Sequence, residues 1–84
     1  MSIGKEMIVI KAKLSERKCR RRDNERRADT LTRVIREIID PLGGDFTGWN
    51  ILQFEVLSRD LVSLWKETKG IDEEIAAMER EIRG

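Results

Sequence analysis

The sequence predicts an all-α protein: an antiparallel helical hairpin with a short extended N-terminal arm, assembled into a coiled-coil oligomer. Three observations predict this class. Residues 15–40 contain neither Pro nor Gly, the segment 41–48 then supplies Pro41, Gly43 and Gly44, and apolar residues follow it at alternating spacings of three and four. The 84 residues allow one domain, 1–84, and so short a chain buries only roughly 60 to 65% of its unfolded surface.

The first segment, 1–14, is expected to be an extended arm. Apolar residues alternate along it, because Ile8, Ile10, Ala12 and Leu14 are separated by Val9, Lys11 and Lys13. Alternation of this kind is typical of a short strand.

The first helix is predicted over 15–40. Ser15 and Glu16 are suited to a helix start, and Pro41 ends the helix. Its second half carries an apolar stripe at helical spacing, formed by Ala28, Leu31, Val34, Ile35, Ile38 and Ile39. Upstream of Ala28 the same face holds polar residues, namely Asn24, Arg21, Arg20 and Arg17.

The segment 41–48 is predicted to be the turn, with Asp45 or Thr47 capping the next helix and with Phe46 and Trp49 packing nearby. The second helix, 48–83, has the clearest periodicity, a seam spaced by three and four residues: Phe54, Leu57, Leu61, Leu64, Thr68, Ile71, Ile75, Met78 and Ile82. Gly70 marks a potential break, but the spacing passes through it, which favours one long helix.

A hairpin folded about Gly43 and Gly44 is expected to place Ala28 opposite Leu61 and Arg20 opposite Lys69. The arginines would then face an apolar seam, and exposing that seam costs about 1.5 to 3 kcal/mol per large aliphatic side chain. We therefore expect a second subunit to cover it; a folded-back arm, 8–10, is the alternative. The expected oligomer interface comprises Leu57, Leu61, Leu64, Ile71, Ile75, Met78 and Ile82.

Charge is divided between the two ends of the chain. The net charge is +1, yet residues 1–36 carry +7 and residues 37–84 carry −6. Residues 17–27 hold seven cations, which are the expected nucleic-acid-binding residues: Arg17, Lys18, Arg20, Arg21, Arg22, Arg26 and Arg27. An arginine-rich helix suits a phosphate backbone. Pairing with the acidic residues Glu67, Asp72, Glu73 and Glu74 is the main alternative, and an acidic protein surface or membrane headgroups are a third.

Catalysis has few candidate groups in this composition. There is no His or Tyr, and the single Cys19 has no partner for a disulfide or a zinc site, so we expect no enzyme activity, cofactor or metal. The longest apolar run, 7–10, is too short for a membrane span. A reducing location is expected: the cytoplasm, or the nucleus or another intracellular site in a host.

Two functions remain open. The leading prediction is a self-associating protein that binds RNA or DNA, mainly through backbone or shape, by its arginine-rich helix. The alternative is a protein-binding adaptor or inhibitor, for example one encoded by a virus or mobile element, whose heptad seam engages another protein and whose basic helix is neutralised by its own acidic C-terminal helix.

Overall fold

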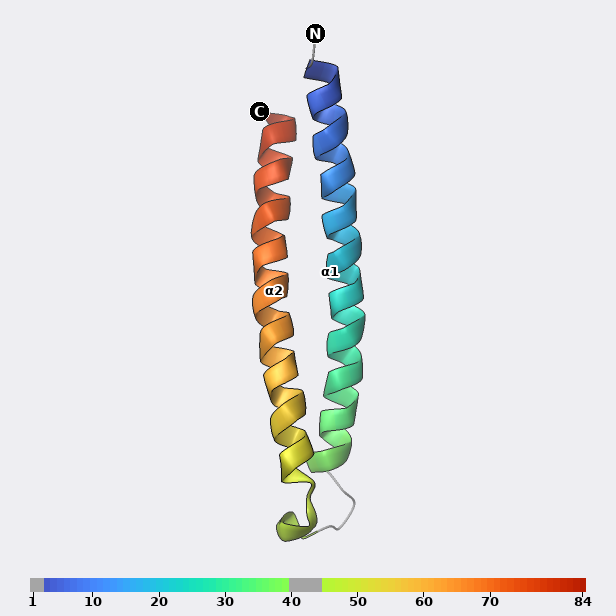
Figure 1. Cartoon of the computed structure of the whole chain (residues 1–84), viewed down its shortest axis with the longest axis vertical. Helices are drawn as coiled ribbons and strands as arrows, with labels where there is room; N and C mark the ends of the chain where they lie inside the picture. The colour runs from blue at the N-terminus through green and yellow to red at the C-terminus, as the bar shows by residue number, and fades with distance from the viewer. Residues whose placement is uncertain (1–2, 40–44) are drawn as a thin grey trace.

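The computed structural model describes residues 3–39 and 45–84, which form two long helices joined at one end. In chain order these are α1 (Ile3–Ile39), the short 3-10 helix η1 (Phe46–Gly48) and α2 (Ile51–Arg83). The helices lie side by side and antiparallel, with the two termini at the same end (Figure 1). The molecule measures 67 × 16 × 15 Å, so the predicted helical hairpin is confirmed as an elongated pair of helices.

The predicted extended arm is wrong, because residues from Ile3 onward belong to α1. The alternation that suggested a strand was misleading, since Ile8 and Val9 are 68% and 50% exposed. Met7, Ile10 and Leu14 are the half-buried residues of this segment, and their spacing of three and four is helical. With no Pro before Pro41, nothing in the chain interrupts the helix.

The end of the hairpin is described from Asp45 onward, and the expected Pro/Gly turn residues 41–44 lie outside the described residues. Asp45 caps η1 by accepting a hydrogen bond from the Thr47 backbone N–H. The rings of Phe46 and Trp49 meet edge to face with their centroids 5.3 Å apart, as expected near the turn.

α2 begins three residues later than predicted and is continuous to its end. Asn50 is its N-cap, because the Asn50 side chain accepts a hydrogen bond from the Gln53 backbone N–H. Gly70 lies within the helix and does not break it. A Cβ atom added there would meet nothing within 4 Å, so the glycine serves no close packing.

On the facing sides of the two helices, buried and half-buried residues recur every three or four positions along the whole length of each helix. On α1 the partly or fully buried residues of this spacing are Met7, Ile10, Leu14, Arg17, Arg21, Asn24, Ala28, Leu31, Ile35 and Ile38. The matching positions on α2 are the nine residues of the predicted seam. Among the described residues only Asn24, Leu64 and Ile71 are below one tenth exposed, at 6%, 5% and 2%, because two helices alone cannot enclose a wider core.

The register differs from the expected one. The Asn24 side chain donates a hydrogen bond to the Thr68 hydroxyl at 3.2 Å, whereas the expected pairing would have set Asn24 against Trp65, three positions away. Arg20, expected to lie opposite Lys69, instead bonds Glu67. A like-charged contact is thereby exchanged for an attractive one, which favours the observed register.

Candidate functional site

The basic segment 17–27 faces the acidic half of α2, and four of its seven cations form ion pairs across the hairpin. Arg17 Nε donates to Glu74 Oε2 at 2.9 Å, and Arg20 Nη2 donates to Glu67 Oε1 at 3.1 Å. Both arginines project from the turns of α1 that lie beside α2, and the acids project back from the facing turns.

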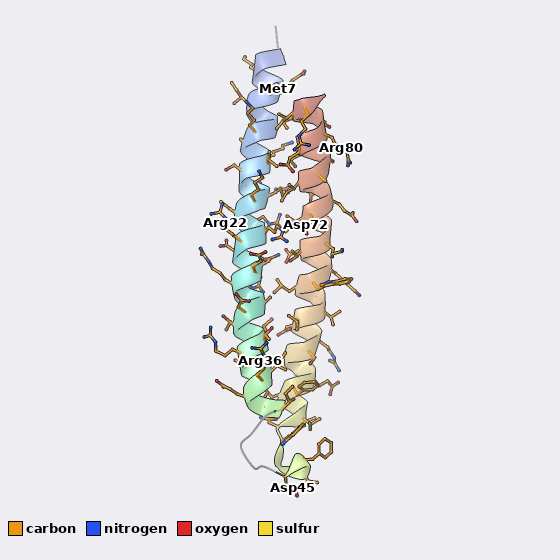
Figure 2. All side chains as sticks on the ribbon, turned by 180° about the vertical axis from the view of Figure 1, so that it is seen from behind. Met7, Arg22, Arg36, Asp45, Asp72 and Arg80 are labelled. Atoms are coloured by element: carbon orange, nitrogen blue, oxygen red, sulfur yellow. The ribbon has the colours of Figure 1, made fainter. Side chains whose placement is uncertain are left out.

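The other two interhelical pairs extend the same network. Arg21 Nε donates to Asp72 Oδ1 at 2.5 Å, and Lys18 Nζ lies 3.6 Å from Glu79 Oε2. Figure 2 shows Asp72 between the helices and Arg22 on the opposite side of α1. All eight side chains keep contact with water, so each pair adds little to stability, and the network matters more for the register of the two helices.

Intrahelical partners hold two of these arginines further. Arg17 Nη1 lies 2.6 Å from Glu16 Oε2, and Arg21 also bonds Glu25, one helical turn away. The hydrogen bond to Glu74 is the main cause that raises the pKa of Arg17, and the hydrogen bond to Asp72 is the main cause that raises the pKa of Arg21. Both guanidinium groups therefore stay charged wherever the protein is folded.

Arg22, Arg26 and Arg27 have no ion pair with α2 among the described residues. Arg26 lies 3.7 Å from Asp23 on its own helix. Arg26 and Arg27 border a hollow of about 500 Å³ on one side of the hairpin, which Asp60 also borders. The structure thus divides the predicted nucleic-acid-binding residues into a paired group, 17–21, and an outward group, 22–27.

Asn24 forms a polar layer in the middle of the apolar seam. Its amide nitrogen donates to Glu67 and to Thr68, each at 3.2 Å, and the Thr68 hydroxyl donates to the Leu64 carbonyl at 2.8 Å. The Asn24 amide nitrogen and the Thr68 hydroxyl are thus both hydrogen-bonded, as buried polar groups generally are. A single buried Asn of this kind fixes the register of packed helices.

The residues of the predicted oligomer interface lie on the side of α2 that faces α1 of the same chain. Leu64 and Ile71 are buried there, and the remaining members, Leu57, Leu61, Ile75, Met78 and Ile82, are half-buried. The seam is covered along its length because α1 continues through Met7, Ile10 and Leu14. Self-association through the seam itself would require the two helices to separate.

A second apolar surface, which the sequence reasoning did not single out, lies on α2 beside the seam. Ile51, Val62 and Trp65 are 43%, 52% and 61% exposed. Together with Ser58 they recur at spacings of seven, four and three, the signal that could have found them. We call Ile51, Ser58, Val62 and Trp65 the Trp65 face. Leu52 and Val56, on another side of α2, are likewise exposed, at 77% and 55%.

Two hollows accompany the Trp65 face. One, of about 640 Å³, is lined by Ile51, Phe54, Ser58 and Val62, with Glu55, Arg59 and Ser63 completing it. The other, of about 280 Å³, opens between the helices beside Trp65, where Ala28 and Leu61 leave room. The Trp65 ring carries Lys69 above it, with the ammonium nitrogen 5.8 Å from the ring centroid. The surface therefore combines apolar walls, a projecting indole and charges at its edge.

Other candidate chemistry is sparse in the described segments, 3–39 and 45–84. Cys19 is an exposed free cysteine, and no cluster of three or more metal-ligating side chains is present there. Neither of the two long helices has the length of apolar sequence that would cross a bilayer. No protein-family model, no curated protein and no solved structure matches the chain.

Proposed function

We propose that this chain is a small non-enzymatic protein-interaction module, an adaptor or inhibitor in class, built as an antiparallel two-helix coiled coil. The observation that supports this proposal is the pairing of Arg17, Lys18, Arg20 and Arg21 with acids of α2. A cation engaged in this way must give up its carboxylate partner before it can bind a phosphate, which weakens the competing nucleic-acid function.

The exposed apolar residues of α2 support the same proposal. A scattered apolar side chain on a surface needs no explanation, but Ile51, Val62 and Trp65 share one face and border hollows. Aromatic side chains in such a setting are typical anchors of protein interfaces. The function therefore depends on the apolar side of α2 more than on the arginines.

Nucleic-acid binding is the second candidate, and the outward group of arginines favours it. Arg22, Arg26 and Arg27 form no ion pair with acids of α2 among the described residues, and Arg33 and Arg36 extend the cationic surface of α1 toward the turn. Binding by these residues would follow the phosphate backbone and would weaken steeply with salt.

Fluorescence polarisation with labelled single-stranded RNA and duplex DNA at low ionic strength separates the two functions. The interaction-module proposal expects no saturable binding by the parent protein. Saturable, salt-dependent binding that is lost in Arg22→Gln/Arg26→Gln/Arg27→Gln would overturn it in favour of the second candidate. The matched control is Arg17→Gln/Arg20→Gln/Arg21→Gln, which removes the same charge from the paired group.

The control variant also tests whether its three arginines stabilise the hairpin by pairing with α2. Because its arginines contact α2, the control variant is expected to melt at a lower temperature than the parent, whereas the outward variant is expected to melt close to the parent. Equal melting temperatures for the two variants would show that the interhelical ion pairs do not stabilise the hairpin.

A further inference from the structure

The hairpin exposes more surface than a folded monomer of its mass. Its accessible surface is 6670 Å², while a compact 9.8 kDa monomer exposes about 5,200 Å². The radius of gyration is 19.1 Å, against about 12 Å for a compact chain of this length. The excess is about 1,500 Å² per chain, so the elongated hairpin has free surface enough for an interface of standard size, about 800 Å² per partner.

The Trp65 face carries both a projection and a shallow, open depression, lined by residues of α2 alone. Trp65 projects at 61% exposure, and the 640 Å³ hollow lies over Ser58, where a small side chain stands between Ile51 and Val62. Trp65 and Ser58 are seven residues apart, so they lie two turns, about 10.5 Å, apart on one side of the helix. A surface that holds a projection and its recess side by side can pair with a copy of itself about a two-fold axis.

Charges at the edge of the face have the same reciprocal arrangement. Glu55 lines the hollow, seven residues before Val62, where it also pairs with Arg59 of its own helix, and Lys69 lies over the Trp65 ring, seven residues after Val62. If two α2 helices cross antiparallel at Val62, then each Trp65 meets the partner's hollow and each Lys69 meets the Glu55 that borders it. Opposite charges then close both ends of the apolar contact.

We propose that the Trp65 face binds a second copy of this chain, with two α2 helices antiparallel about Val62 and each Trp65 seated in the hollow over Ser58 of the other copy. The dimer is a four-helix arrangement that leaves the intrachain seam intact. This inference rests on the proposed function, since it names the partner that the interaction module binds.

Sedimentation equilibrium over a range of concentrations tests the proposal. The parent is expected to have the mass of a dimer, and Trp65→Glu is expected to weaken the dimer about 30-fold or more, as loss of a central aromatic anchor does. The matched control is Val56→Glu, because Val56 is similarly exposed but lies nine residues from Trp65, about two and a half turns, on the opposite side of α2. That control is expected to remain dimeric.

A charge exchange tests the orientation. Glu55→Lys and Lys69→Glu are each expected to weaken the dimer, and the double variant is expected to recover a good part of the loss because the charges are again opposite between copies. Circular dichroism of each variant confirms that the helices are retained.

Three outcomes would overturn the proposal: a parent that stays monomeric at every concentration, a Trp65→Glu variant that dimerises as the parent does, or a double variant no better than the singles. If the parent protein is monomeric and also binds no nucleic acid, only the proposal that its partner is a second copy is refuted. Saturable nucleic-acid binding by the outward arginines would refute the proposed function itself, so the two failures are distinguishable.

Discussion

Ile71 is the most deeply buried side chain described, and replacing it with Ala tests whether the hairpin is stabilised by the seam in the register found here. Ile71 is 2% exposed, beside the turn of α2 where Asp72 receives Arg21. Ile→Ala in a core costs about 2 to 5 kcal/mol, and a two-helix seam can partly close around the gap, so we expect about 2 to 3 kcal/mol.

A loss of about 2 to 3 kcal/mol corresponds to a fall in melting temperature of roughly 8 to 24 °C for a domain of this size. Thermal unfolding followed by far-UV circular dichroism measures it, at one fixed protein concentration because association shifts the midpoint. The same substitution at Ile8, which is 68% exposed on α1, is the matched control and is expected to change stability by about 0.5 kcal/mol or less. Equal losses for Ile71→Ala and Ile8→Ala would refute the seam as the source of stability.

Three further predictions follow from the helices and their polar contacts. Gly70→Ala should raise the free energy of unfolding by about 0.5 to 1 kcal/mol in chemical denaturation, because the glycine lies in open space within α2; a decrease would mean that α2 needs a bend there. Asn24→Asp should destabilise the hairpin near neutral pH, because it removes the hydrogen-bond donor to Thr68 and sets a second carboxylate beside Glu67. Melting curves of this variant should show higher stability in mild acid, where the new carboxylate is protonated. Unchanged stability at neutral pH would contradict the polar layer. The raised pKa values of Arg17 and Arg21 mean that the stabilisation from their ion pairs is fully present below the ordinary arginine pKa and is lost only as the pH rises through the raised values. Because lysine loses its charge at lower pH than arginine, Arg17→Lys/Arg21→Lys should lose stability relative to the parent above about pH 10. Parallel pH profiles of stability for the two proteins would count against the pairing.

Much of the fold could be predicted from local pattern. The seam of α2 is visible in the sequence because spacings of three and four persist from Phe54 to Ile82. The seam of α1 is harder to recognise, because Arg17, Arg21 and Asn24 interrupt its apolar residues and divide Met7, Ile10 and Leu14 from Ala28 onward. An alternating apolar segment then resembles a strand, and only its contact with a second helix shows that it continues the first.

The candidate site could be predicted only in part. The basic segment and the acidic half of the chain are evident from composition, which allows the basic segment either to pair with those acids or to bind another partner. Which cations pair depends on the register and on the reach of each side chain, so Arg20, expected opposite Lys69, bonds Glu67. The hydrogen bond between Asn24 and Thr68 joins residues more than forty positions apart, and local sequence pattern does not predict such contacts.

The sequence by itself determined the helices, the division of charge and the seam of α2, because periodicity and the absence of Pro within a segment act locally along the chain. Only the tertiary structure decided that Arg17, Arg20 and Arg21 pair with acids of the same hairpin and that α1 covers the seam. It also left Ile51, Val62 and Trp65 exposed beside that seam. The physical reason is geometric: two helices bury one narrow face each, so the register decides which charges meet, and every apolar residue outside that face stays in contact with water.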